Sequence, residues 1–170
     1  MPTAVSAAVF SLTAPLSGVL VPLESVPDPV FAKKLVGDGV SIDPTSQVLL
    51  APCAGKVIQV HACGHAATIE TEGGLEVMMH IGLDTVQLRG KGFTPRVKTG
   101  DLVKTGQPLI EFDADYIAVN ARSLLTQVLI TTPDRVESFH PASGTVEAGK
   151  DPILEHVLAF PRSRAANRGS

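Results

Sequence analysis

Residues 65–80 read HAATIETEGGLEVMMH, two short runs of strand-forming residues with a histidine at each outer end. An acidic residue and two glycines separate the runs, a pattern typical of an antiparallel hairpin. If Glu72 and Gly73 form a two-residue turn, His65 lies directly opposite His80, with about 4.5–5.5 Å between their Cβ atoms. A turn at Gly73 and Gly74 leaves the histidines diagonal instead. Either register predicts two imidazoles on one face of a sheet.

The chain after His80 brings a third polar group toward the same place. Gly82 lets the backbone leave the strand sharply, and Asp84 can then turn back toward the imidazole. Two close imidazoles cannot both be protonated cheaply, so at least one is expected to be neutral, with a lone pair. That lone pair suits phosphoryl acceptance on nitrogen or metal binding. The alternative for each ring is a hydrogen-bonded structural histidine.

Turn signals recur along the chain and favour an all-β fold. The pattern Pro-x-x-Gly-x-Leu/Val occurs three times, each copy being expected to turn into a strand. Helix is expected only at 28–36, with Pro29 near its start, and at 113–124, with Asp113 as its cap. The predicted fold class is an antiparallel β-sandwich of short strands with one or two short helices. Alternating or β-branched runs predict strands at 18–23, 47–51, 56–61, 65–71, 75–81, 107–112, 127–132 and 144–147.

Composition limits the partners and the location. The 170 residues include 15 Gly and 13 Pro, and their formal net charge is -3. A net negative charge gives no general attraction for nucleic acid, and the sequence has no run of about 18 apolar residues that could cross a membrane. Cys53 and Cys63 form neither a CxxC motif nor a disulfide framework, which favours a reducing compartment. We therefore expect a soluble cytoplasmic protein that binds no nucleic acid and does not insert into membranes.

One domain with two less ordered ends is expected. Residues 1–14 are apolar but lack the charged start of a signal peptide, and they are predicted to be a flexible N-terminal segment. Residues 15–160 form the predicted domain. Residues 161–170 contain three Arg and no acid, and they are predicted to be a disordered tail or a linker.

Motifs spread over residues 15–152 resemble those of a known family. The segment from Gly74 to Val86, with Val-Met-Met-His-Ile-Gly-Leu at its centre, is similar to the active-site signature of the glucose-type enzyme IIA domains of the bacterial phosphoenolpyruvate-dependent sugar phosphotransferase system. This resemblance implies an antiparallel β-sandwich with a duplicated hybrid motif, and phosphoryl relay in sugar uptake. Supporting motifs lie at 26–31, 37–39, 51–52, 64–66, 91–93 and 110–113.

The resemblance also implies roles for individual residues. His80 would accept a phosphoryl group from a phosphohistidine of the carrier protein HPr and donate it to a cysteine of a sugar permease's IIB domain. His65 would stabilise the phosphoryl group, and the backbone near Gly82 would fix the His80 tautomer. A threonine helps to orient the partner histidine in the family, but Cys63 stands at that position here, and a thiol is a weaker hydrogen-bond partner. No cofactor is implied, and zinc would bind His65 and His80 only with a carboxylate from a partner.

A relay must dock its partners on one surface around the reacting histidine. By family position, Asp28 and Asp84 would form an acidic rim that meets arginines of HPr. The alternative for the apolar members of this surface is ordinary core. Those apolar members are Val30, Phe31, Val36, Met78 and Val86.

Three other interpretations stay open. A regulatory protein of the same fold would bind transporters or kinases without passing phosphate on. A zinc peptidase would use the spacing from His80 to Asp84, but the chain has no His-x-His motif to complete such a site. A lipoyl or biotin carrier is suggested by residues 100–109, but the expected lysine is missing. Of the remaining histidines, His61 is expected to be a surface or partner-facing residue, His140 and His156 are expected to be solvated, and none of the three is assigned a role.

Overall fold

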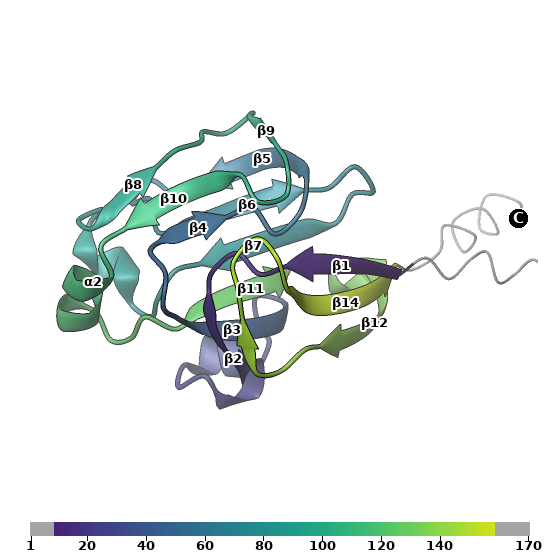
Figure 1. The fold of residues 1–170 in the computed structure, drawn as a ribbon, viewed down its shortest axis with the longest axis horizontal. Helices are drawn as coiled ribbons and strands as arrows, with labels where there is room; N and C mark the ends of the chain where they lie inside the picture. The colour runs from purple at the N-terminus through teal and green to yellow at the C-terminus, as the bar shows by residue number, and fades with distance from the viewer. Residues whose placement is uncertain (1–8, 159–170) are drawn as a thin grey trace, which may run out of the picture.

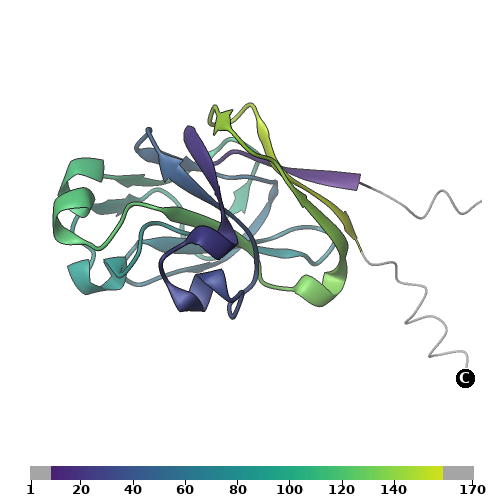
Figure 2. The same ribbon diagram turned by 90° about the horizontal axis from the view of Figure 1, so that it is seen from below.

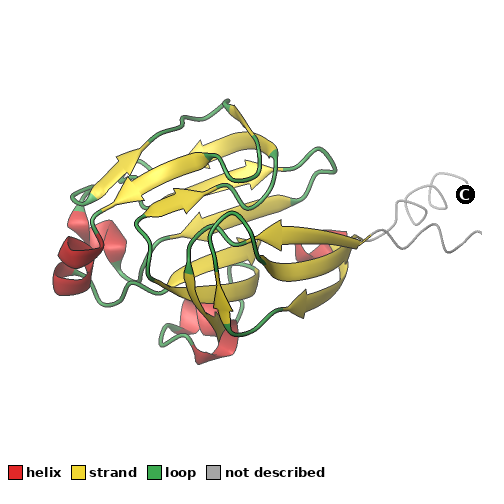
Figure 3. Cartoon of the chain, viewed as in Figure 1, coloured by secondary structure: helices red, strands yellow, loops and turns green. Residues whose placement is uncertain are grey.

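Short antiparallel strands make up most of the fold, as Figures 1 and 3 show for the computed structural model, which describes residues 9–158. The predicted fold class is confirmed. Both predicted helices are present with narrower bounds, α1 (Pro29–Ala32) and α2 (Ala114–Asn120). The described residues also contain three 3-10 turns, η2 (Leu23–Ser25), η3 (Thr85–Leu88) and η4 (Pro133–Arg135). The strands are β1 (Val9–Thr13), β2 (Gly18–Pro22), β3 (Asp38–Pro44), β4 (Val48–Leu50), β5 (Gly55–Val60), β6 (Ala66–Glu70), β7 (Glu76–His80), β8 (Phe93–Pro95), β9 (Leu102–Val103), β10 (Pro108–Phe112), β11 (Thr126–Ile130), β12 (Val136–Pro141), β13 (Thr145–Val146) and β14 (Pro152–Leu158).

The strands form one large sheet and two small ones. The eight-stranded sheet has the order β13-β2-β3-β11-β7-β6-β5-β9, and the three-stranded sheets have the orders β1-β14-β12 and β4-β10-β8. Buried side chains from all three sheets meet in one core, so the small sheets form the second layer of a sandwich. The hairpin of β6 and β7 lies inside the large sheet, where both of its edges are paired.

Alternation along the central strands separates the two faces of the large sheet. Val77 and Met79 of β7 and Val128 and Ile130 of β11 are fully buried in the core between the layers. Their neighbours in sequence point to the opposite face, because successive side chains of a strand alternate. In β7, the side chains of Met78 and His80 therefore lie on the opposite face of the large sheet.

A short capped helix partly covers this second face. The side chain of Asp28 accepts a hydrogen bond from the Val30 N–H at 3.0 Å, and Pro29 occupies the first turn of α1. Figure 2 shows η2 and α1 on the side of the large sheet away from β1. A second apolar cluster joins this segment to β7 and β11, and it consists of Leu23, Val26, Phe31, Leu83 and Leu129, with Met78 packed against them.

The first part of the chain differs from the prediction. Within the predicted flexible segment 1–14, residues Val9–Thr13 form β1 and pair with β14, and Leu12 is buried. This part of the prediction is wrong because the sequence of β14 has no clear alternation of apolar and polar residues. The strand with which the apolar N-terminal residues pair could therefore not be recognised from the sequence. The predicted tail at 161–170 lies outside the described residues. Strands β3, β8, β9, β12 and β14 were also not predicted.

Among residues 9–158, no helix combines the length and the apolar character needed to cross a bilayer.

Candidate functional site

His80 ends β7 and has one ring nitrogen fixed by the backbone. Its neighbours across the sheet are Ala66 of β6 and Gln127 of β11. Nδ1 of His80 lies 3.0 Å from the carbonyl oxygen of Gly82. A carbonyl oxygen only accepts hydrogen bonds, so Nδ1 carries the hydrogen and donates it, and Nε2 keeps the lone pair.

The turn at Gly82 allows this hydrogen bond. Its φ is +76°, and an added Cβ would lie 2.5 Å from Cγ2 of Thr85 and 2.7 Å from the carbonyl oxygen of Ser123. The hydroxyl of Thr85 donates to the carbonyl oxygen of Ile81 at 2.6 Å, which closes the turn from the other side. Only glycine fits this position without strain or displacement of its neighbours.

His65 lies beside His80, with 4.8 Å between ring centroids and 79° between ring planes. The structure thus brings together the two imidazoles that the hairpin predicted. The predicted register, however, is wrong by one residue, because His80 pairs with Ala66. The hairpin turn spans three residues, 72–74, with Gly74 at φ +87° and a hydrogen bond from the Thr71 N–H to the Leu75 carbonyl oxygen.

The position of His65 outside the strand explains why the rings still meet. In a regular strand with this register, His65 and Ala66 would point to opposite faces, and His65 would leave His80. β6 begins only at Ala66, and Gly64 turns the chain with φ +79° just before His65. The side chain of His65 is therefore free of the strand alternation and reaches His80.

A third imidazole, His61, belongs to the same cluster and was missed by the sequence analysis. Its ring centroid lies 4.3 Å from that of His65, with 53° between the planes. Nδ1 of His61 accepts a hydrogen bond from the Cys63 N–H at 3.1 Å. The signal that could have found it is the His-x-x-x-His spacing across Gly64, which marks a tight turn between two paired strands.

Burial keeps the two facing rings neutral. Burial, and then the neighbouring His80 and His61, lower the pKa of His65 from 6.5 to about 4. Burial also lowers the pKa of His80, against the opposite effects of its hydrogen bond to Gly82 and of nearby Asp28. Neutral rings at physiological pH leave the Nε2 lone pair of His80 available.

Stability should fall with acid because of these lowered pKa values. A histidine whose pKa is lower in the folded state binds fewer protons there than in the unfolded chain. The free energy of unfolding is therefore expected to be fully retained above pH 6.5 and to fall between pH 6.5 and about 4, the interval for His65. Urea unfolding over this pH range should give a flatter profile for His65→Gln than for the unchanged chain. Parallel profiles would contradict the assignment.

The predicted partner-facing residues divide into exposed and buried ones. Val30, Val36 and Val86 are exposed, and Met78 is half-buried. Phe31 fits its alternative as a core residue: only 6 % of it is exposed, and its ring packs 5.1 Å from the ring of His80. The cause is α1, which turns the aromatic side chain inward onto the second apolar cluster.

The two predicted rim acids also have partners within the chain. Asp84 is exposed, with its backbone in the left-handed region at φ +58°, and it lies 3.9 Å from Arg122. Its side chain makes this contact rather than the predicted one with the imidazole. Asp28 is half-buried and caps α1. Each acid therefore stays at the margin of the site and leaves the two rings free of direct ion pairing.

The described residues offer no ready metal site. Within 9–158, no group of three or more His, Cys, Asp or Glu side chains is arranged to hold a metal ion. Nδ1 of His80 and Nδ1 of His61 are both engaged with backbone groups. Two imidazoles alone fill half of a tetrahedral shell.

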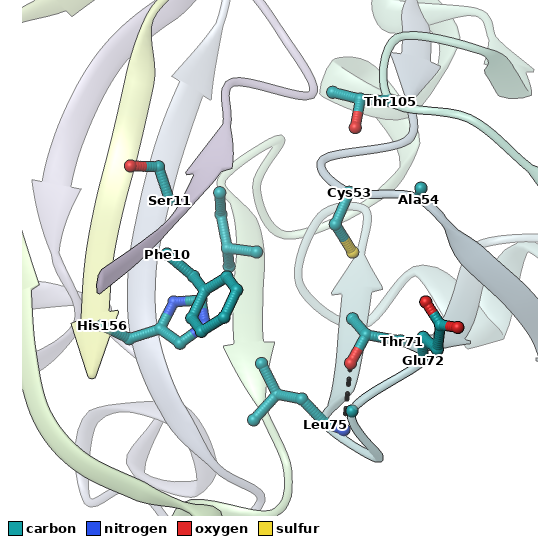
Figure 4. Close-up of a pocket in the computed structure, with 11 residues that line it drawn as sticks. Phe10, Ser11, Cys53, Ala54, Thr71, Glu72, Leu75, Thr105 and His156 are labelled. Carbon is teal, nitrogen blue, oxygen red and sulfur yellow. Dashed lines mark hydrogen bonds between the residues drawn. The ribbon is translucent and has the colours of Figure 1, made fainter. Parts of the chain in front are cut away.

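A separate cavity lies at the other end of the β6 and β7 hairpin (Figure 4). Its volume is about 560 Å³, and Phe10, Cys53, Thr71 and His156 are among its lining residues. His156 was predicted to be solvated, which is wrong: it is 3 % exposed, and Phe10 stacks on it at 5.7 Å. Burial raises the pKa of the Cys53 thiol to about 12, so this cysteine is not a nucleophile at neutral pH. The cavity takes no part in the histidine site.

Comparison with known proteins identifies the family. Residues 10–136 match the family model of the phosphoenolpyruvate-dependent sugar phosphotransferase system, EIIA 1. The chain is 50 % identical over 131 residues to a glucose-specific EIIA component of Staphylococcus epidermidis, covering 77 % of this chain and 79 % of that protein. It is 42 % identical over 156 residues to the N-acetylglucosamine-specific EIICBA component of Escherichia coli, covering 91 % of this chain and 24 % of that longer protein.

A solved structure agrees with this match. Glucose permease IIA from Mycoplasma capricolum superposes with a TM-score of 0.82 at 31 % identity, and the alignment covers 87 % of this chain and 96 % of that one. Sequence and fold thus point to the same group of proteins. The chain belongs to the EIIA 1 family of the phosphoenolpyruvate-dependent sugar phosphotransferase system.

Proposed function

We propose that this chain accepts a phosphoryl group on Nε2 of His80 from a phosphohistidine of HPr and passes it to a cysteine of a sugar permease's IIB domain. Members of the family act as phosphotransferase components that relay phosphoryl groups in sugar uptake. The observation that supports His80 as the acceptor is its hydrogen bond to Gly82, which leaves Nε2 as the nucleophilic atom beside His65.

The acceptance step needs no proton to be removed from His80. The Nε2 lone pair attacks phosphorus in line with the P–N bond of phospho-HPr, the new N–P bond forms, and the leaving imidazole of HPr takes back its electron pair. The positive charge that forms on the His80 ring is stabilised through the Nδ1–H bond to the Gly82 carbonyl oxygen. In the second step a cysteine thiolate of IIB attacks the same phosphorus, and the electron pair returns to Nε2.

His65 is suited to hold the equatorial phosphoryl oxygens. Its neutral ring has one N–H and lies nearly perpendicular to the ring of His80, with 79° between the ring planes. A phosphoryl group on His80 adds negative charge next to that ring, which favours donation by an N–H in this half-buried site. His65 therefore contributes a hydrogen bond and no covalent step.

Partners would dock on the exposed apolar residues around His80, with Asp84 at the rim. We expect Asp84→Asn to weaken binding of HPr by about 3–5-fold at low salt, because one attraction for a partner arginine is lost. Asparagine tolerates the left-handed backbone at this position, so the fold should be unaffected. Titration calorimetry at low and high salt measures the difference, which should vanish at high salt. Glu137→Gln on β12 is the matched control, and equal affinities for both variants would remove the role given to Asp84.

Reconstitution of the relay tests the proposed function. The chain is incubated with phosphoenolpyruvate, enzyme I and HPr, and intact-mass measurement should show one added phosphoryl group that is acid-labile. Omission of HPr should abolish the label, and addition of a IIB domain should remove it. Label that appears without HPr, or that stays on the chain in the presence of several family IIB domains, would contradict the proposal.

A further inference from the structure

We infer that His61 is a positioning residue for phosphoryl delivery, holding the ring of His65 against His80 by direct ring contact. This inference rests on the proposed function. It gives a role to a histidine that the sequence pattern left without one.

His65 is in ring contact with both of the other imidazoles. The ring centroid of His65 lies 4.3 Å from that of His61 and 4.8 Å from that of His80. The ring of Phe93 lies further away, at 6.1 Å. His61 therefore makes the closest aromatic contact to His65, closer than that of the reacting histidine itself.

His65 has no hydrogen bond that fixes its ring from behind. Its Nδ1 is buried and has no partner within the described part of the chain. A ring whose inner nitrogen is unbonded is free to change its tilt unless neighbours hold it by packing. Among the rings around it, that of His61 is the nearest, at 4.3 Å between centroids, and this contact restricts the tilt of His65.

His61 is itself held firmly. Its Nδ1 accepts from the Cys63 N–H at 3.1 Å, its N–H donates to the Ala66 carbonyl oxygen at 2.9 Å, and its carbonyl oxygen accepts from the Gly64 N–H at 2.7 Å. A side chain that accepts from a backbone N–H two residues ahead fixes the turn locally. The turn that carries His65 is thus anchored to the ring that packs on it.

The same contact acts on the protonation of His65. His61 is among the groups that lower the pKa of both other rings. Besides His61, the group that faces His65 is His80. Besides His61, the charged group near His80 is Asp28. A neutral His65 held in one tilt presents its N–H to the phosphoryl group without reorganisation.

Three substitutions of His61 distinguish the effect of its ring from the effect of its hydrogen bond to the Cys63 N–H. His61→Phe keeps an aromatic ring and loses the acceptor, His61→Asn keeps an acceptor for the Cys63 N–H and loses the ring, and His61→Ala loses both. Each variant is charged from phospho-HPr, its phosphate content is determined by intact mass, and single-turnover delivery to IIB is then timed. Imidazole resonances of His65 in each uncharged variant report ring position independently of transfer, and thermal unfolding shows whether the fold is retained.

We expect all three variants to be charged fully. Delivery by His61→Phe should stay within about 3-fold of the unchanged chain, whereas His61→Asn and His61→Ala should be about 10-fold slower, because small displacements of an aligned group reduce transfer strongly. The His65 resonances should shift most in the two variants without a ring. Unchanged delivery and resonances in His61→Ala, or a His61→Phe variant as slow as His61→Ala, would overturn the inference. Failure to charge the unchanged chain would refute the proposed function, and the resonances would still test the ring contact.

Discussion

His80→Ala is expected to abolish phosphoryl uptake from phospho-HPr, a loss of at least about 10³-fold, because the substitution removes the nucleophilic nitrogen itself. His65 does not replace it, since its ring is 2 % exposed and cannot be approached in line by a partner. Transfer of labelled phosphate from HPr measures the effect. The free energy of unfolding, determined alongside, shows whether the space left between Phe31 and His65 disturbs the fold.

His140→Ala provides the matched control. His140 is exposed on β12, in a sheet that does not contain the site, and this variant should be charged at the rate of the unchanged chain. Label retained by His80→Ala at the level of His140→Ala would show that another residue accepts the phosphate.

His65→Gln is expected to separate the two halves of the relay. The nucleophile on His80 is intact, so uptake from HPr should continue at a similar rate. Delivery to IIB should fall by about 10²-fold, because a positioned donor to the transferring group contributes about that much. Quench-flow measurement of both steps gives the two rates from one preparation.

The pattern of the two rates is the informative result. Equal slowing of uptake and delivery would indicate that His65 supports the position of His80 and not the phosphoryl group. Unimpaired delivery would remove the donor role altogether.

The fold could be predicted wherever strands carry their own pattern. β6 and β7 are runs of strand-forming residues on either side of Gly73, and β2 and β13 follow Pro-x-x-Gly turns, so each was found. β3 was missed because residues such as Gly39 and Asp43 obscure its alternation, although it pairs with both β2 and β11. An added Cβ at Gly39 would lie 1.9 Å from the Val128 carbonyl oxygen, so glycine is required there by the neighbouring strand. Such a requirement is visible only after the strands are paired.

The site could be predicted in its members but only partly in its geometry. His65 and His80 were identified from one hairpin, and their ring contact depends on details that the pattern does not contain: a three-residue turn and the left-handed Gly64. The contact of Phe31 with His80 depends on packing between segments far apart in sequence, whereas His61 lies only four residues from His65 and its contact depends on the conformation of the turn at Gly64. The long-range contact of Phe31 can be seen only once α1 is packed on the assembled sheet.

The nitrogen that carries phosphate tests the central claim most directly. With the histidines labelled with ¹⁵N, the charged chain is examined by ³¹P and ¹⁵N NMR for coupling between phosphorus and one ring nitrogen. We predict coupling to Nε2 of His80, with Nδ1 still protonated and bonded to Gly82. Phosphorus coupled to Nδ1 of His80, or to any nitrogen of His65 or His61, would contradict the account.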